Sequence, residues 1–185
     1  MAATLPHCLL LPGYTDAGPG HWMSLWHREQ PEWKRVEQRD WERPEKDEWV
    51  AALDAAVAAA PAPVCLIAHS LGCTTVAHWV AERGGANVAA AFLVAPADAD
   101  RPGFPPEMTG FAPVPEIALP FSTMVVASST DPYLTLSRAR TLAHAWGSEL
   151  VEIGDAGHIC TDSGHGRWPE GRRLLDRLLS RGEFA

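Results

Sequence analysis

The sequence has little positive charge and no long apolar run. Lys and Arg together number 15 against 23 Asp and Glu, which gives a formal net charge of −8. Proteins that bind nucleic acid carry a basic surface that contacts phosphates, so this balance argues against a nucleic-acid partner. No stretch of about 20 apolar residues is present, and the N-terminal region lacks the basic segment of a signal peptide. We therefore expect a cytoplasmic protein with no membrane-spanning helix.

Signals for a bound metal or nucleotide are also missing. The four cysteines form no C-x-x-C pair. The segment 158–165 holds two His and one Cys, but no second ligand pair accompanies them for a tetrahedral zinc site. Gly13, Gly18 and Gly20 lack the Gly-Lys-Ser/Thr and G-x-G-x-x-G signatures of phosphate-binding loops. The sequence thus predicts no metal, no other cofactor and cysteines that stay reduced.

The composition that remains is typical of one globular domain. The chain has 185 residues, 46% hydrophobic and 21% charged, enough to bury a core without a disulfide or a metal. We expect a single domain over residues 1–185. Eight tryptophans are unusual for this length. Most fall on predicted helices, where we expect them to pack in the core, and Trp22 is the one that we expect in a pocket.

Short apolar runs alternate with helical patterns along the chain. Strands are predicted over 7–11, 33–38, 63–68, 88–95, 122–127 and 150–153. Helices are predicted over 21–30, 45–60, 71–83, 134–146 and 168–180. Most of the strands are apolar throughout, as in parallel sheets that helices cover on both faces. The pattern predicts a three-layer α/β/α sandwich with a mostly parallel six-stranded sheet, in the strand order 2-1-3-4-5-6.

Residues 96–120 are the exception to this alternation. The segment holds seven prolines in 25 residues and shows no clear period. A long irregular segment in a compact domain is usually functional. We expect it to form one wall of a substrate pocket, through Phe104, Met108 and Phe111. The alternative is that these side chains only attach the segment to the core.

A candidate nucleophile lies where the third strand meets the next helix, in the run Ala68-His69-Ser70-Leu71-Gly72. A sharp strand-to-helix turn exposes the Ser hydroxyl above the sheet, and small residues on either side let the two elements pass closely. The helix N-terminus favours negative charge at this point. Ser70 is therefore a candidate nucleophile, and the alternative is a serine that only caps the helix. We expect His69 to line the pocket or to have a structural role.

A serine nucleophile needs a base and an acid that orients the base. Asp131 follows the fifth predicted strand and His158 follows the sixth. This order and placement match α/β-hydrolases, in which the three side chains meet at the carboxyl edge of the sheet. Asp131 followed by Pro132 is also a common turn sequence. Together with Ser70, the two residues predict a catalytic triad.

Two backbone N–H groups are expected to form an oxyanion hole. One belongs to Leu71, the residue after the nucleophile. The other comes from the loop after the first strand, where we expect the N–H of Tyr14 to serve. Gly13, directly before it, is expected to border the same pocket.

Six segments carry a resemblance to a known family. They are Leu11–Gly13, Gly18–Trp22, Ile67–Gly72, Ser129–Tyr133, Gly157–His158 and Ser163–Gly171. Spread over nearly the whole chain, they resemble the small α/β-hydrolases grouped with the retinoblastoma-binding serine hydrolase and its bacterial relatives. The family's catalytic Ser, Asp and His fall on Ser70, Asp131 and His158. The resemblance implies a serine hydrolase of small esters or amides without a cofactor, in a minimal fold that lacks a full lid domain.

Two positions depart from the family pattern. Ala68 replaces the first Gly of the usual elbow, which is a small-for-small change. The nearest match to a retinoblastoma-binding Leu-x-Cys-x-Glu segment, Leu71–Thr75, lacks the acidic residue, so a retinoblastoma-type partner is not expected and any protein partner stays unknown. The expected function is cleavage of a small carboxylic ester or amide through an acyl-enzyme, by an esterase, amidase or aminopeptidase. The alternatives are a non-catalytic interaction module on a hydrolase scaffold and an acyl transferase.

Overall fold

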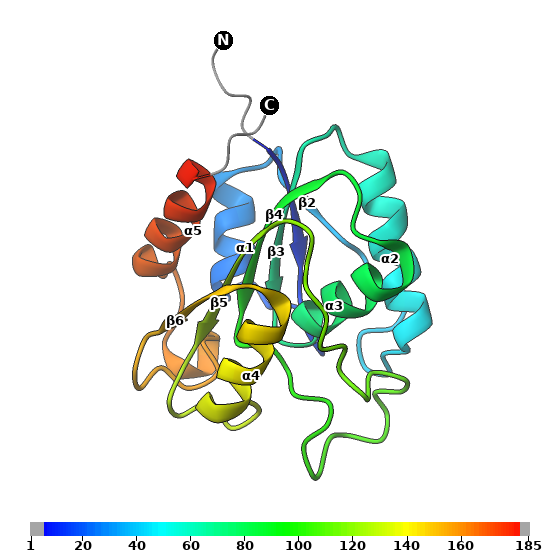
Figure 1. Cartoon of the computed structure of the whole chain (residues 1–185). Coiled ribbons are helices and arrows are strands. Elements are labelled where there is room, and N and C mark those ends of the chain that lie inside the picture. Colours follow the sequence, from blue (N-terminus) through cyan, green and yellow to red (C-terminus); the bar gives the residue numbers. More distant parts are fainter. Residues whose placement is uncertain (1–5, 182–185) are drawn as a thin grey trace.

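A computed structural model describes residues 6–181 and places a six-stranded parallel sheet at their centre (Figure 1). The strands are β1 (His7–Leu11), β2 (Lys34–Arg35), β3 (Val64–His69), β4 (Val88–Val94), β5 (Ser122–Ala127) and β6 (Glu149–Glu152). Their order across the sheet is β2-β1-β3-β4-β5-β6, and every neighbouring pair is parallel. The predicted parallel sheet and its strand order are confirmed.

Helices cover both faces of the sheet, which confirms the three-layer sandwich. They are α1 (Trp22–Glu29), α2 (Lys46–Ala59), α3 (Leu71–Arg83), α4 (Leu136–Trp146) and α5 (Pro169–Arg181), and a 3₁₀ turn, η1, covers Thr161–Ser163. Helices α1 and α5 pack on one face, and α2, α3 and α4 pack on the other (Figure 1). Because all six strands are parallel, their carboxyl ends lie at one edge of the sheet. The loops after β1, β3, β5 and β6 meet at this edge.

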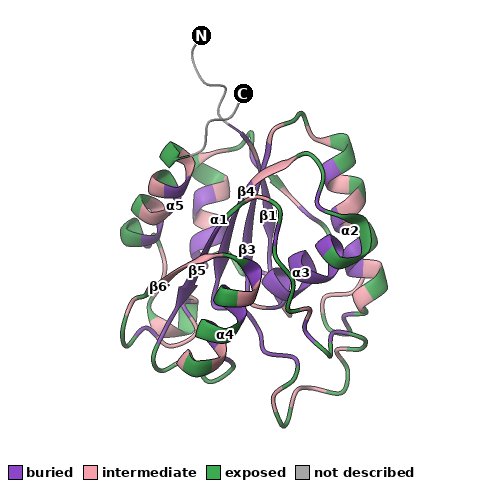
Figure 2. Cartoon of the chain, in the orientation of Figure 1, coloured by how far each residue is buried: buried purple, intermediate pink, exposed green. Residues whose placement is uncertain are grey.

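Strand β3, which leads to Ser70, is packed on both of its faces. All six of its residues are buried (Figure 2). Its side chains alternate between two hydrophobic cores. Cys65 and Ile67 pack toward α1 and α5, whereas Leu66 and Ala68 pack toward α2 and α3. Each large aliphatic side chain buried in this way stabilises the fold by about 1.5–3 kcal/mol. The strand that delivers Ser70 is thus fixed from both sides.

The tryptophans act mainly as core residues. Trp22, Trp26, Trp49, Trp79 and Trp146 are among the largest fully buried side chains. Three of the four cysteines, Cys8, Cys65 and Cys73, are buried as free thiols, and Cys160 is partly exposed. The tryptophans on helices pack in the core, as expected. Trp22, which was expected in a pocket, is buried in the core as well.

Two regions differ from simple strand–helix alternation. Strand β2 has two residues where six were expected, because only Lys34 and Arg35 align with β1. Its charged side chains suit an edge strand. Residues 96–120 form no helix or strand, and they extend beyond the carboxyl edge of the sheet (Figure 1).

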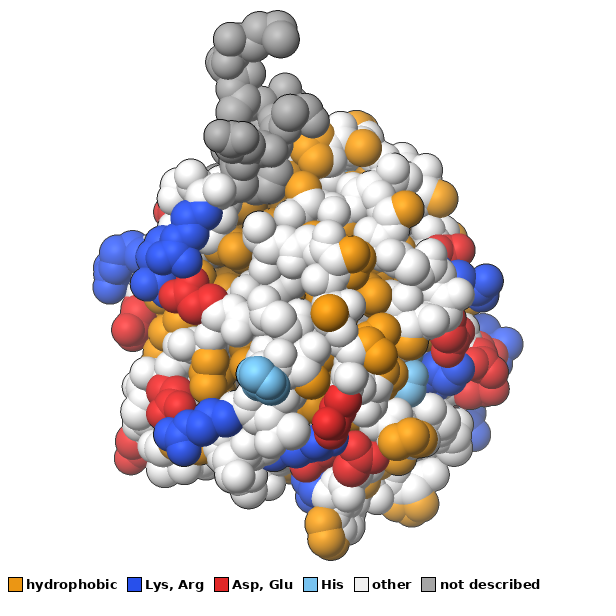
Figure 3. All heavy atoms as spheres, viewed as in Figure 1, with side chains coloured by type: hydrophobic (Ala, Val, Ile, Leu, Met, Phe, Trp, Pro, Cys, Tyr) orange, Lys and Arg blue, Asp and Glu red, His pale blue; other side chains and the backbone are white. Residues whose placement is uncertain are grey.

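The surface carries charges of both signs. On the face shown in Figure 3, Lys and Arg side chains lie beside Asp and Glu side chains, without an extended basic patch. Of the helices between residues 6 and 181, none is long and apolar enough to span a membrane.

Candidate active site

Ser70 occupies a strained turn between β3 and α3. Its φ of 55° and ψ of −120° place a non-glycine residue in a region that L-residues seldom adopt. Hydrogen bonds on both sides hold this geometry: its N–H donates to the Val94 carbonyl at 3.0 Å, and its carbonyl accepts from the N–H groups of Cys73 and Ala97. The strain fixes the direction of the Ser70 hydroxyl.

The end of β1 passes so close to this turn that small residues are required next to Ser70. A Cβ on Gly72 would overlap the carbonyl oxygen of Leu11, so only glycine fits there. Ala68, on the other side of Ser70, is fully buried between Leu11 and Leu93 on the neighbouring strands. Alanine is thus accommodated where the family pattern has the first glycine.

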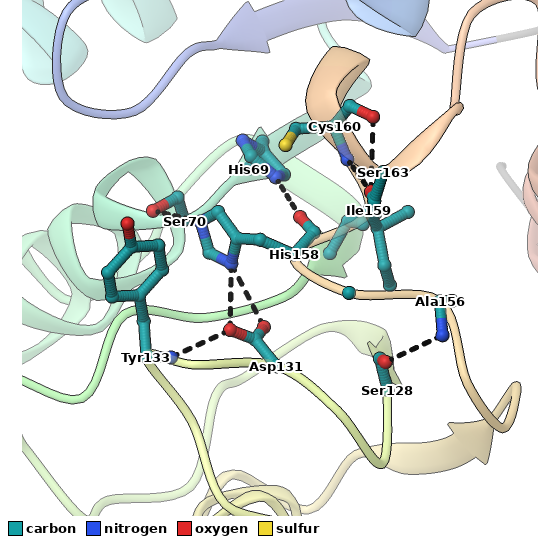
Figure 4. A network of polar contacts seen from close by, with 12 residues as sticks. His69, Ser70, Ser128, Asp131, Tyr133, Ala156, His158, Ile159, Cys160 and Ser163 are labelled. Carbon is teal, nitrogen blue, oxygen red and sulfur yellow. Dashed lines mark hydrogen bonds and ion pairs between the residues drawn. The ribbon is translucent and has the colours of Figure 1, made fainter.

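The three side chains expected to form a triad lie in one hydrogen-bonded row (Figure 4). Ser70 Oγ is 2.9 Å from His158 Nε2, and His158 Nδ1 lies 2.9 and 3.0 Å from the two carboxylate oxygens of Asp131. The Asp131 side chain is 1% exposed, and it also accepts the Tyr133 N–H at 2.9 Å. The residues come from the loops after β3, β5 and β6.

Two buried donors hold the backbone of the loop that carries His158. His69 Nε2–H donates to the carbonyl of His158, and the indole N–H of Trp22 donates to the carbonyl of Ile159, each at 2.9 Å. Ile159 is fully buried with a φ of 49°, which is an outlier for a β-branched residue. The two bonds hold the loop in this unfavourable conformation.

Hydroxyl groups join this loop to the one that carries Asp131. Ser128 Oγ donates to the Gly154 carbonyl at 3.1 Å. It also accepts the Ala156 N–H at 3.0 Å (Figure 4). Thr130 Oγ1 accepts the Gly157 N–H at 3.0 Å. The sequence reasoning missed both residues. The signal for them was the run of hydroxyl residues directly before Asp131.

The two residues expected to supply the oxyanion donors line the same cleft as Ser70. Tyr14 and Leu71 both border the cleft, and within residues 6–181 neither backbone N–H donates to a protein acceptor. A Cβ on Gly13 would come within 2.8 Å of Ser70 Cβ and 3.2 Å of the Leu71 nitrogen. Glycine at position 13 therefore lets the β1–α1 loop approach Ser70 closely.

A cleft of about 680 Å³ opens above Ser70. Of the residues expected to line a pocket, Gly13, His69, Phe104 and Met108 do so. Four apolar residues, which we call the apolar wall, form part of its lining: Phe104, Pro105, Met108 and Tyr133. The Tyr133 ring packs edge-on against His158, with 4.6 Å between ring centroids. Arg101 and Cys160 also border the cleft.

Trp22 and Phe111 do not line the cleft, contrary to the sequence prediction. Trp22 is fully buried under the loop after His158, because its N–H bonds to the Ile159 backbone. Phe111 is fully buried in the core, edge-on to Trp49. The segment 96–120 thus borders the cleft with its first half and packs Phe111 into the core.

Two buried histidines that line the cleft, His21 and His69, are poor bases. Burial, reinforced by the nearby imidazole of His158, lowers the pKa of His21 to about 4. The same causes hold the pKa of His69 well below its usual value. Both rings are therefore neutral at pH 7. Sequence reasoning had assigned no role to His21, although the segment Gly18–Trp22 contains it.

Residues 8–177 match the model of a family described as serine hydrolase. The chain belongs to the serine hydrolase family. No protein with a curated description matches it by sequence.

Solved structures similar to this serine hydrolase share its fold. A protein from Pectobacterium atrosepticum, provisionally described as a YdeN-like hydrolase, is 35% identical with a TM-score of 0.84, and the match covers 95% of this chain and 91% of that one. The ydeN gene product of B. subtilis is 19% identical, with a TM-score of 0.74 over 95% and 99% of the two chains. Esterase 2 of Thermogutta terrifontis is 15% identical, with a TM-score of 0.70 over 97% and 84%. The α/β-hydrolase fold expected from the sequence is confirmed.

Proposed function

We propose that this hydrolase cleaves small carboxylic esters through Ser70, His158 and Asp131. The observation that carries the proposal is the unbroken row of contacts from Ser70 Oγ through the imidazole to the Asp131 carboxylate, each within 3.0 Å. Asp131 accepts the Nδ1–H of His158, which leaves Nε2 free to take the proton of the Ser70 hydroxyl. The alkoxide then attacks the ester carbonyl.

The charge that develops on the carbonyl oxygen is stabilised by backbone donors. We assign this role to the N–H groups of Tyr14 and Leu71, which are free to bind an oxyanion. His158 next protonates the departing alcohol, which leaves an acyl group on Ser70. A water molecule, deprotonated by the same imidazole, releases the acid and restores the enzyme.

The cleft suits a short acyl chain. The apolar wall offers an aliphatic chain contact with Phe104 and Met108, and residues 96–120 add no helix that could deepen the cleft into a tunnel. Esterase 2 of T. terrifontis, which has the same fold, is described with butyrate bound. We infer that acetate to butyrate esters are the substrate class.

A fluorophosphonate probe tests the nucleophile directly. The wild-type protein should be labelled at Ser70 and should hydrolyse p-nitrophenyl butyrate, whereas Ser70→Ala should do neither. Asp131→Asn should keep the fold and lower kcat by about 10³–10⁴-fold, since the imidazole loses the partner that sets its tautomer. Circular dichroism confirms that each variant is folded. Absence of labelling in folded wild-type protein would overturn the proposal, and a panel of aminoacyl amides separates amide from ester cleavage.

A further inference from the structure

His21 and His69, here called the histidine pair, lie side by side in the lining of the cleft. Each side chain belongs to a residue only 6% exposed, and both border the cleft. Their ring centroids are 4.8 Å apart in an edge-to-face arrangement. The mechanism proposed above gives neither ring a role in the chemistry. Two polar rings buried this deeply at a substrate site call for an explanation.

The known hydrogen bonds fix where each neutral ring carries its proton. His21 Nδ1 accepts the N–H of Met23 at the start of α1, so its proton is on Nε2. His69 Nε2 bonds to the backbone carbonyl of His158, which can only accept, so its proton is on Nε2 and its Nδ1 is an acceptor. The histidine pair therefore presents one donor, His21 Nε2–H, and one acceptor, His69 Nδ1.

Neither of these two nitrogens has a protein partner among residues 6–181. No hydrogen bond joins the two rings there, although they are adjacent. In the same part of the chain, the buried side-chain atoms without partners belong to other residues, namely Gln38, Ser148, Trp168 and Arg177. The two imidazole nitrogens are thus not sealed in the core and are open to the cleft that both residues line.

The histidine pair and the apolar wall flank the catalytic imidazole. The His69 ring lies 4.8 Å from that of His158, and the Tyr133 ring lies 4.6 Å from it on the other side (Figure 4). If the apolar wall holds the acyl chain, the side of the histidine pair is left for the alcohol part of the ester. Asp162 borders the cleft as well, whereas the carboxylate of Asp16 is paired with Arg35.

We propose that the histidine pair binds an uncharged hydroxyl group on the alcohol part of the substrate. The hydroxyl oxygen accepts from His21 Nε2–H, and its proton is donated to His69 Nδ1. A hydroxyl can do both, whereas a carboxylate only accepts and an ammonium only donates. The inference rests on the proposed ester hydrolysis and narrows the substrates to esters of diols or other polyols.

Two butyrate esters of similar size test this. One is 2-hydroxyethyl butyrate and the other is propyl butyrate, and the readout is the ratio of their kcat/KM values. His21→Asn keeps an acceptor for the Met23 N–H but lacks Nε2–H. His69→Gln keeps a donor to the His158 carbonyl but lacks Nδ1. Each variant should lower the preference for the hydroxylated ester by about 3–10-fold, as expected for one hydrogen bond.

Met108→Ala is the matched control, because Met108 lies on the apolar wall. It should change the preference among acetate, butyrate and hexanoate esters while the ratio for the two alcohols stays as in wild type. A ratio that is unchanged in both histidine variants would overturn the hydroxyl subsite and leave ester hydrolysis standing. Failure of the wild type to react with fluorophosphonate would overturn the proposed function instead.

A second readout needs no turnover of either ester. Ethane-1,2-diol should slow phosphonylation of wild-type Ser70 more than propan-1-ol does, and His21→Asn should remove this difference. Equal protection by the two alcohols in wild type would contradict the proposal.

Discussion

The indole N–H of Trp22 donates to the carbonyl oxygen of Ile159 across 2.9 Å, between residues 137 positions apart in the chain. Trp22 is fully buried at the first turn of α1, and Ile159 directly follows His158. The bond connects a helix on one face of the sheet to a strained residue beside His158, the proposed general base. It makes Trp22 a positioning residue for His158.

Trp22→Phe should therefore damage turnover more than binding. An aromatic ring remains, but the indole N–H is lost, which leaves a buried carbonyl unpaired and costs about 1–3 kcal/mol of stability. A small displacement of His158 should lower kcat by about 10–100-fold with KM nearly unchanged. Trp26→Phe is the matched control, since Trp26 on the same helix makes an equivalent bond, at 2.9 Å, to the carbonyl of Arg167. It should lose similar stability but keep kcat within about twofold. Equal kcat losses in the two variants would contradict the positioning role.

Arg138 binds the segment 96–120, which supplies three of the four residues of the apolar wall, Phe104, Pro105 and Met108. Its guanidinium binds the carboxylates of Asp98, Asp100 and Glu116, and its side chain is only 19% exposed. Asp100 in turn accepts the Val114 N–H. Arg138→Met would leave three carboxylates facing one another, so we expect a loss of about 1–3 kcal/mol in urea denaturation and a several-fold higher KM for butyrate esters.

Arg140→Met is the comparison for this variant. Arg140 lies on the exposed side of the same helix, α4, and pairs with Glu152 of β6. The Arg140 side chain is 60% exposed. Exposed pairs contribute little, so the loss should be below about 1 kcal/mol and KM should not change. Similar changes in stability and in KM for the two variants would show that the ion pairs of Arg138 do not position the apolar wall.

Gly13→Ala should impair the oxyanion hole. The added Cβ would meet Ser70 Cβ at 2.8 Å and the backbone oxygen of His69 at 3.1 Å, so the β1–α1 loop must move away. Displacing the Tyr14 N–H should lower kcat by about 10²-fold and slow phosphonylation of Ser70. In Gly20→Ala, by contrast, the first contact is an ordinary one, 3.4 Å from Thr161 Cγ2, and activity should persist. Full activity of Gly13→Ala would refute the assignment of Tyr14.

Protonation of His21 should destabilise the fold in acid. The pKa of this ring is about 4 in the folded protein, against 6.5 for an unperturbed histidine. Between these values the unfolded chain binds the proton more readily, so stability is complete above about pH 6.5 and declines as the pH falls toward 4. The depression corresponds to about 3 kcal/mol at the acid end. Urea denaturation at several pH values should therefore show a shallower decline for His21→Asn than for wild type, and parallel curves would argue against a buried neutral His21.

Local patterns predict the framework of this protein because its strands are continuous apolar runs. Strand β3 is buried on both faces and ends at Ser70 with a helix directly behind it, so one stretch of sequence encodes both the strand and the elbow. Parallel strands end at one edge, which is why Asp131 and His158 could be assigned to the same place as Ser70.

Contacts between distant segments were not predictable in the same way. The sequence shows that Trp22 is large and helical but not that its N–H bonds to Ile159, a partner set by tertiary packing. Phe111 lies in a proline-rich segment without a period, so nothing local separates a pocket position from the core position that it occupies against Trp49. The cleft position of His21 depends on the path of the loop before α1.

The burial of three of the four thiols has a practical consequence. A hydrogen bond with Cys8, together with burial, raises the pKa of the Cys65 thiol, and burial raises that of Cys73. Reagents that attack thiolates are thereby excluded from the core. Cys160, partly exposed at the cleft, is the thiol that they reach. A maleimide fluorophore should therefore attach at Cys160, two residues after His158. Its emission should report ligand entry while Ser70, Asp131 and His158 stay unmodified.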